Sequence, residues 1–405
     1  MVRHASWRAT RFLRELSQLQ LGVGPQSDGY YLNRVLSSAD FHLGEKTRVF
    51  VEFKNGLEFG RNGGPRPVQD EDKLDLQQLF FEVSSRSLRE RPFMTFKIGR
   101  QELHYGEGTL LDVRDLNVRR SFDGAKLILR PRDWQVDLFA MKPSQSKTGI
   151  LDVFDDYPTH DQTLWGVYAT TTKHLPEFLS QLDVYYLGLD RKSAVFNRGT
   201  ARDQRHALGI LIHGRKGNFS YFSEADLQVG KFGAGNLLAW KYGQNVSYIF
   251  AHVKLQPTLT LDGAISSGDN GKKNGDLGTF YPLFPKGLYY GYIDDSGSLN
   301  AIVVHPHITF HLSKTVSFAP GAYFFWRESA GDGLYSAPGG LVRTAQGVSA
   351  KYVGAMQDLA VTWTADRHTT VQLLGAHYEA GSYLKQTVPP GRNIGYVSAK
   401  IIYRF

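Results

Sequence analysis

The chain has 405 residues, 13% of them aromatic, and a formal net charge of +8. It contains no cysteine, which excludes disulfides, thiolate metal sites and cysteine nucleophiles, and no apolar run reaches the roughly 18 residues of a membrane helix. The basic balance indicates an anionic partner. Because no nucleic-acid motif or basic amphipathic helix occurs, we expect an acidic polymer or solute, or a lipid surface, and no nucleic acid.

Segments with the period-2 alternation of β-strands follow one another from about residue 29 to the C-terminus. The stretch 5–20 adds one more, although Leu13 to Leu16 is equally compatible with a helix. The sequence therefore predicts an all-β chain of about eighteen strands, with boundaries good to about 2–4 residues. The predicted strands are 5–20, 29–43, 46–56, 75–84, 92–104, 118–130, 134–142, 162–173, 180–190, 203–214, 218–230, 236–253, 257–267, 299–312, 315–328, 348–364, 369–383 and 392–405.

The connections between these segments alternate between short and long. Short turns on one rim and long loops on the other are typical of a transmembrane antiparallel β-barrel. We therefore expect the short turns and both termini at the periplasmic rim, and the long loops outside the cell. A β-sandwich or a propeller is the alternative. The long connections are 57–74, 105–117, 143–161, 268–298 and 329–347.

The last segment points to a bacterial outer membrane. Its residues alternate between an apolar face, which ends in Tyr403 and Phe405, and a mostly polar face with Lys400. A closing strand that ends in an aromatic residue resembles the last strand of bacterial outer-membrane barrels, and we expect Phe405 to act as the assembly signal. Met1 to Arg14 lacks the apolar segment of a signal peptide. We therefore expect a single barrel domain, 1–405, whose start is truncated or wrongly assigned.

The alternation also predicts which side chains face the lumen. A charge that faces lipid costs roughly 2–4 kcal/mol at mid-bilayer, so the charged strand residues are assigned to the interior. The predicted lumen carries cations interspersed with fewer acids. Its predicted lining or substrate-binding residues in the strands are Arg34, Arg48, Glu52, Lys54, Glu82, Lys126, Arg130, Arg327 and Lys400.

Several sequence blocks occur in the order expected for one family. The two most specific are Gly99-Arg100-Gln101-Glu102-Leu103-His104-Tyr105-Gly106 and Arg119-Arg120-Ser121-Phe122-Asp123-Gly124; weaker ones are Tyr31–Arg34, Gly60–Pro67, Ser267–Asp269 and Leu283–Pro285. Together they resemble the alginate export family of outer-membrane proteins over nearly the whole chain from about residue 29. The resemblance implies a barrel of about eighteen strands with an electropositive pore for an acidic polysaccharide.

The two specific blocks place charges at the extracellular ends of adjacent predicted strands. These charged residues are Arg100, Glu102, Arg119, Arg120 and Asp123. Guanidinium groups bind carboxylates bidentately, so one interpretation is a constriction that binds a uronate. The other is an ion-pair network that fixes a loop over the rim. The alternation slips at Gly99, which suggests a β-bulge there.

Two groups of residues raise the question of a metal. His305, His307 and His311 share the lumen face of one strand, and two histidines at i, i+2 can ligate zinc. No carboxylate is near them in sequence, so polar lining is the favoured interpretation, and no cofactor is expected. The loop from Gly263 to Gly275 has the oxygen ligands that calcium takes, but it lacks EF-hand spacing, and a solvated loop is favoured.

The leading hypothesis is a passive channel for an anionic polysaccharide such as alginate, or for another acidic solute. An outer-membrane enzyme acting on lipid or glycan is a second class, with Ser220, Ser266 and Ser267 available as nucleophiles. We expect no enzyme activity, because no G-x-S-x-G motif occurs. A barrel that anchors binding loops is a third. Expected partners are outer-membrane lipid, the barrel assembly machinery and periplasmic export components.

Overall fold

The computed structural model describes most of the chain, with the backbone alone for the first strand. The described residues are 2–16, 28–64, 69–88, 91–146, 153–271, 275–287, 290–291 and 297–404.

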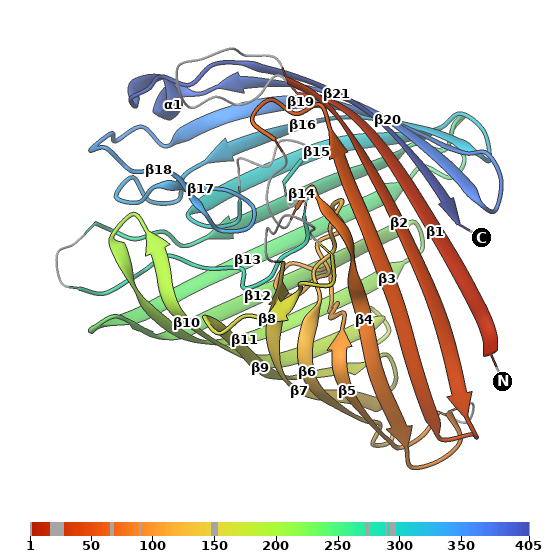
Figure 1. Cartoon of the computed structure of the whole chain (residues 1–405). Helices are drawn as coiled ribbons and strands as arrows, with labels where there is room; N and C mark the ends of the chain where they lie inside the picture. The colour runs from red at the N-terminus through yellow and green to blue at the C-terminus, as the bar shows by residue number, and fades with distance from the viewer. Residues whose placement is uncertain are drawn as a thin grey trace.

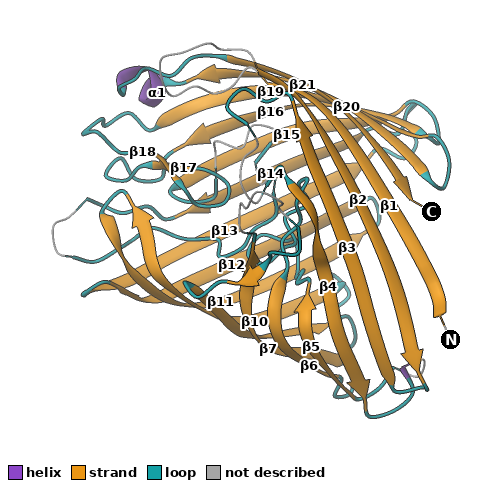
Figure 2. Ribbon diagram, in the orientation of Figure 1, coloured by secondary structure: helices purple, strands orange, loops and turns teal. Residues whose placement is uncertain are grey.

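Strands dominate the molecule and close into a barrel (Figure 1 and Figure 2). Neighbouring strands are antiparallel, and the ring closes because β1 pairs with both β2 and β21. Among the described residues, the large sheet has 19 strands, and all except the two-residue β8 form the ring, which leaves 18. The ring strands are β1 Val2–Leu16, β2 Asp28–Leu43, β3 Thr47–Phe59, β4 Asp72–Ser84, β5 Met94–Gln101, β6 Phe122–Leu129, β7 Trp134–Gln145, β9 Gln162–Thr171, β10 Gln181–Phe196, β11 Gly199–Lys216, β12 Phe219–Phe232, β13 Gly235–Ile249, β14 Thr258–Ser266, β15 Ala301–His311, β16 Val316–Trp326, β19 Tyr352–Thr364, β20 Thr369–Ala380 and β21 Ile394–Arg404.

The predicted fold class is confirmed. The N-terminal stretch that was ambiguous in sequence is the strand β1. Four short elements were not predicted, because a few residues are too short to show a period. They are β8 Tyr157–Pro158, β17 Leu334–Tyr335, β18 Leu341–Arg343 and the helix α1 Ser382–Gln386. Within the described ranges, no helix has the length and apolarity needed to cross a membrane.

The two rims of the barrel differ in the length of their connections. Short turns such as 44–46 and 365–368 lie on the rim where Val2 and Arg404 lie (Figure 1). The opposite rim carries the long connections, although the turns 197–198 and 233–234 on that rim are also short. Val2 and Arg404, the first and last described residues, therefore lie at the rim of the short turns, and the assignment of that rim to the periplasm stays a prediction. Phe405 lies outside the described residues.

The outer wall is apolar and the inner wall is polar, the reverse of a soluble core. On β12, Leu227 and Val229 are exposed, whereas Glu224, Asp226 and Gln228 are buried. Because side chains alternate across a strand, the exposed apolar rows face outward and the buried polar rows face the lumen. This arrangement suits a barrel that is surrounded by lipid.

Two long connections fold inward and fill part of the lumen. Loop A is the connection between β5 and β6 (102–121), and loop B is the connection between β14 and β15 (267–300). Leu111 of loop A and Phe280 of loop B belong to one apolar cluster with wall residues such as Leu187. The lumen is therefore narrowed by loops that pack against the inside of the wall.

Candidate functional site

Loops A and B are joined by backbone hydrogen bonds inside the barrel. The amide of Phe284 donates to Leu110 O at 2.8 Å, and the amide of Asp112 donates to Phe284 O at 2.8 Å. The Arg120 guanidinium then donates to Asp112 O at 3.2 Å and to Pro285 O at 3.1 Å. One arginine thus connects the two loops that narrow the lumen.

A cavity of about 240 Å³ lies beside this junction, and most of its charged lining residues are cations. Its charged lining residues are Lys54, Arg114, Arg119, Arg120 and the carboxylate Asp156. Tyr281 and Phe284 supply apolar surface, and three serines supply hydroxyl groups. These hydroxyls are buried and have no hydrogen-bond partner among the described residues; they belong to Ser121, Ser144 and Ser146.

Arg100, by contrast, belongs to an ion-pair network in the wall. Its guanidinium binds both carboxylate oxygens of Asp123, at 3.0 and 3.2 Å, and Oδ2 of Asp156 at 3.2 Å. Lys54 reaches the same Asp156 oxygen at 2.6 Å. Arg100 therefore fixes the segment around Asp156, which is the loop-fixing alternative raised by the sequence.

The predicted bulge at Gly99 is wrong, because the ladders on both sides of β5 keep one register through it. Gly99 instead adopts a φ of 122°, in the region that favours glycine. This backbone conformation of Gly99 directs the side chain of Arg100 toward its carboxylate partners. No extra residue is inserted into the strand.

Three more of the predicted residues, Arg34, Glu102 and Arg119, form ion pairs beside a second cavity. Arg34 binds Asp115 at 2.8 Å, and Arg119 binds Glu102 at 2.8 Å. They line a cavity of about 350 Å³ together with Arg404 of the last strand. Lys400 lies on the lumen side of that strand, because the alternating Val397 and Ile401 are exposed on the other side.

Deeper in the barrel, predicted cations are paired with acids. Arg48 binds Asp40 at 2.7 Å and approaches Glu82 at 3.7 Å, and Lys126 approaches Asp137 at 3.4 Å. Glu52 accepts a hydrogen bond from Gln78 at 3.2 Å.

Two predicted lining residues do not line the lumen. Arg130 follows the end of β6, in a turn, and donates to Pro92 O at 3.1 Å. Arg327 is fully buried, and its guanidinium donates to four backbone carbonyls: Ala330, Asp332, Val348 and Ala350. Both positions lie just beyond a strand end, where the strict alternation that assigned them no longer applies.

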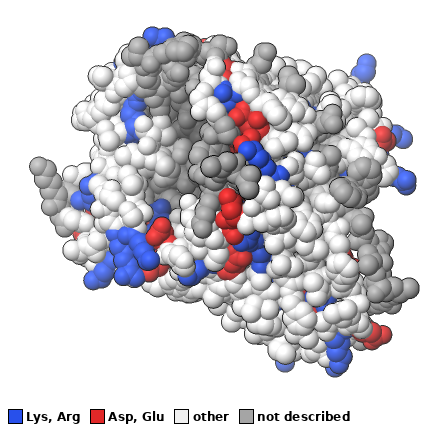
Figure 3. All heavy atoms as spheres, viewed as in Figure 1, with Lys and Arg blue, Asp and Glu red and all other residues white. Residues whose placement is uncertain are grey.

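Many cations of the interior are paired with acids. Among the fully buried described residues, carboxylates outnumber lysines and arginines, whereas the predicted excess of cations along the partly exposed lumen lining stays a prediction. Figure 3 shows charged side chains of both signs side by side over the middle of the viewed face, and most of the other described residues on that face are uncharged. Positive charge exceeds negative charge locally, in the cavity beside loop A.

Sequence reasoning missed several charged residues that face the lumen. Lys97 approaches Glu82 at 3.8 Å, Lys241 binds Glu224 at 2.6 Å, and Arg205 binds Asp203 at 3.0 Å. For Lys97 and Lys241 the alternation contained the signal, because each lies between outward apolar or aromatic neighbours; Arg205 lies between Gln204 and His206, so its strand gave a weaker one. Arg114 lies between the two most specific family blocks, in loop A, where no alternation assigns a direction.

The closed antiparallel ring, the apolar outer wall and the polar lumen define a bacterial outer-membrane β-barrel with the architecture of a channel. A family model described as alginate export matches residues 8–397. The chain therefore belongs to the alginate export family, as the sequence blocks predicted.

Solved structures share the barrel fold at low sequence identity. A BenF-like porin from Pseudomonas fluorescens Pf-5 superposes with a TM-score of 0.66 and 10% identity, covering 99% of this chain and 98% of that one. OccAB1 of Acinetobacter baumannii gives 0.64 and 11%, covering 99% and 96%. OccK2 (OpdF) of Pseudomonas aeruginosa, in complex with glucuronate, gives 0.60 and 12%, covering 99% and 97%. A search of curated proteins finds no match.

Proposed function

We propose that this barrel conducts an anionic polysaccharide such as alginate, or another acidic solute, across the outer membrane. The family supplies the substrate class, and the cavity beside loop A supplies the recognition chemistry. The expected partners are those of such a channel: outer-membrane lipid, the barrel assembly machinery and periplasmic export components.

The observation that carries the proposal is the charge of this cavity. Lys54 and three arginines line it with one carboxylate. Guanidinium forks match carboxylates in geometry and charge, and the unpartnered serine hydroxyls suit the hydroxyl groups of a sugar. A uronate unit carries both kinds of group, so the cavity is complementary to it.

Arg120 adds a second reason. Its hydrogen bonds go to backbone carbonyls, and within the described residues it forms no ion pair. Burial, and then the nearby Arg114 guanidinium, lower the pKa of Arg120 in this loop, which means that its charged form is disfavoured. A carboxylate that enters the cavity would offset this cost, because it stabilises the charged form.

The carboxylates elsewhere in the lumen support conduction rather than tight binding. A channel must bind its solute strongly enough to admit it and weakly enough to release it. Pairs such as Arg48 with Asp40 and Lys126 with Asp137 keep the remaining cations partly neutralised. A polyanion would therefore meet one attractive position beside loop A.

The test is block of the ionic current through single barrels in planar bilayers by short oligouronates. Arg114→Gln and Arg120→Gln should each weaken the block about tenfold, because a hydrogen bond to a charged group contributes about 1.5–3 kcal/mol. Arg202→Gln is the matched control, because Arg202 pairs with Asp190 at an exposed position. Neutral oligosaccharides of the same length should block poorly.

Three outcomes would count against the proposal. If oligouronates block Arg114→Gln and the Arg202→Gln control equally well, the cavity does not recognise the uronate. A barrel that inserts but does not conduct would favour the surface-binding alternative. Hydrolysis of lipid or glycan that disappears in Ser220→Ala or Ser266→Ala would favour an enzyme.

A further inference from the structure

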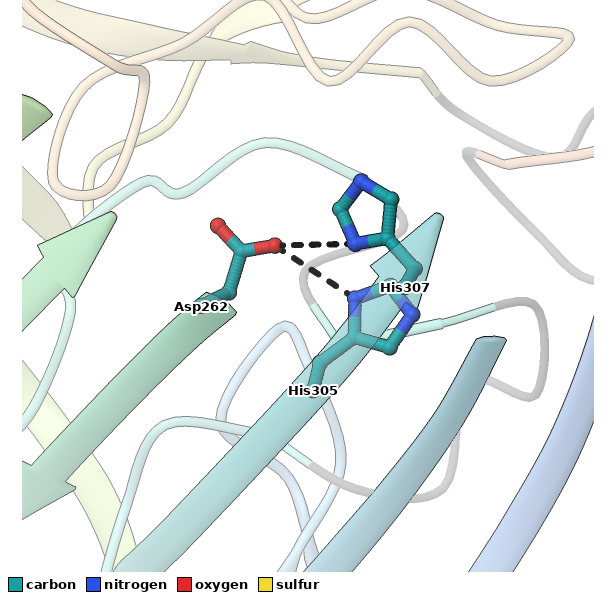
Figure 4. A group of neighbouring side chains, drawn as sticks. All are labelled: Asp262, His305 and His307. Carbon is teal, nitrogen blue, oxygen red and sulfur yellow. Dashed lines mark ion pairs between the residues drawn. The ribbon is translucent and has the colours of Figure 1, made fainter. Parts of the chain in front are cut away.

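Away from loop A, the lumen wall holds a cluster of two histidines and a carboxylate. Asp262 on β14 lies opposite His305 on β15 in the strand register, and His307 follows on the same face. Figure 4 shows the three side chains converging from these two strands. Nothing in the sequence joins the three residues, because Asp262 is far from the histidines along the chain.

The distances within the cluster match a metal site better than hydrogen bonds. Oδ2 of Asp262 lies 3.4 Å from His305 Nδ1 and 3.5 Å from His307 Nδ1. A charge-assisted hydrogen bond would be about 2.7–2.9 Å long. Ligands at about 2.0–2.1 Å from a tetrahedral Zn²⁺ lie about 3.3–3.4 Å apart. The two observed separations are therefore compatible with atoms that share a metal ion, and the three ligand atoms all lie within 4.8 Å of one another.

Two of the three candidate ligands, Asp262 and His305, are held in place by groups behind them. Asn245 donates to the other oxygen of Asp262 at 2.6 Å, which leaves Oδ2 directed at the histidines. Nε2 of His305 faces Asp358 Oδ1 at 3.5 Å, and the ring stacks on Tyr323 with centroids 3.5 Å apart. A carboxylate behind the imidazole is the usual outer support of a metal-binding histidine.

Two further observations concern the immediate surroundings of the cluster, where three buried polar atoms form no hydrogen bond within the described residues. The His305 side chain is 9% exposed, and its Nε2, His307 Nδ1 and Asp358 Oδ1 are buried without hydrogen bonds. Gly321 of β16 lies against the same atoms, and a Cβ there would be 2.7 Å from His305 Nε2 and 3.0 Å from Asp358 Oδ1. The absence of a side chain at this position makes room for the cluster.

We propose that Asp262, His305 and His307 form a binding site for a divalent transition metal, with Zn²⁺ as the best match. Two imidazoles and one carboxylate are ligands that Zn²⁺ prefers, and three protein ligands leave one position open. The open position is directed toward the lumen, because Asp262 and His305 line a cavity of about 230 Å³. Another acidic group, Asp75, Asp155 and Asp156, carries no such proposal, because Lys54 and Arg100 already neutralise it.

The test measures binding of Zn²⁺ alone to the complete, refolded barrel in detergent by calorimetry, with Co²⁺ absorption as a report of tetrahedral geometry. We expect one Zn²⁺ per chain and intense visible Co²⁺ bands. The double variant His305→Ala/His307→Ala should lose stoichiometric binding. Asn245→Ala and Asp358→Asn, which change only the supporting groups, should weaken it about 10–100-fold.

His311→Ala is the matched control. It removes a histidine from the same strand, at an exposed position at the strand end and outside the cluster, and it should bind Zn²⁺ like the unmodified protein. Heat-modifiable migration on gels shows that each variant is folded; if the double variant does not fold, Asp262→Asn replaces it. Equal Zn²⁺ affinity in the cluster variants and in His311→Ala, or octahedral Co²⁺ spectra, would overturn the proposal.

Discussion

Gly99 shows how a single backbone position organises the wall. A Cβ at this residue would lie 2.3 Å from Leu79 O of the neighbouring strand, and its φ of 122° is strained for other residues. The conformation lets Arg100 reach Asp123 and Asp156. The sequence showed that the alternation of apolar and polar residues slips at Gly99. Only the backbone geometry shows that this slip does not come from an inserted residue.

We expect Gly99→Ala to destabilise the folded barrel by more than about 1–3 kcal/mol, the usual cost of a strained backbone position, because a steric clash is added. Urea unfolding of the barrel in lipid vesicles would measure this. Gly217→Ala is the control, because Gly217 has a φ of 58° but nothing within 4 Å of its Cβ. Equal losses in both variants would show that the contact with Leu79 is unimportant.

His104 in loop A provides a pH-dependent contact. The hydrogen bond to Asp112, 2.6 Å long, is the main cause that raises the pKa of His104 above its ordinary value of 6.5. A raised pKa stabilises loop A at pH values below 6.5, and this contribution disappears as the pH rises through the folded pKa. We expect higher amide protection factors in loop A, corrected for the intrinsic pH dependence of exchange, at pH 6 than at pH 8. Asp112→Asn should abolish the difference in protection, and a difference that persists would exclude this contact.

At the scale of elements, the sequence predicted the strands far better than the loops. A strand can be recognised from the alternation within one short segment. The neighbours of Lys126 were therefore enough to predict that its side chain faces the lumen. The inward folding of loops A and B depends on contacts such as Leu111 with Phe284, which are distant along the chain. The pairing of Asp262 with His305 required the register between two strands, which no single segment encodes.

Arg327 fixes the connection between β16 and β19. It supplies the donors for four carbonyl groups and stacks over Tyr383 at 3.8 Å. We expect Arg327→Met to lower the free energy of unfolding by about 3 kcal/mol or more, since each buried carbonyl left without a donor costs about 1–3 kcal/mol.

Limited proteolysis between residues 327 and 351, together with urea unfolding, would measure the effect of Arg327→Met. Arg327→Lys should recover only part of the loss, because an ammonium lacks the planar fork of the guanidinium. Full recovery by lysine would mean that the charge alone matters there.

At the scale of the whole molecule, acids and bases alternate through the lumen and leave a local positive excess beside loop A. We therefore expect a modest anion preference in reversal potentials across a KCl gradient. The preference should vanish near 1 M salt, where the Debye length is about 3 Å. Arg114→Gln/Arg119→Gln should shift the reversal potential toward cations. A strongly cation-selective unmodified barrel would contradict this expectation.

The loops that narrow the lumen are also part of the folded core of the barrel. Loops A and B share an apolar cluster and backbone hydrogen bonds with each other and with the wall. Widening the pore would therefore require breaking contacts of the folded core. We expect the pore to keep a fixed width and not to open and close. The rate of solute passage through such a barrel would then depend on the width, the charge and the concentration of the solute.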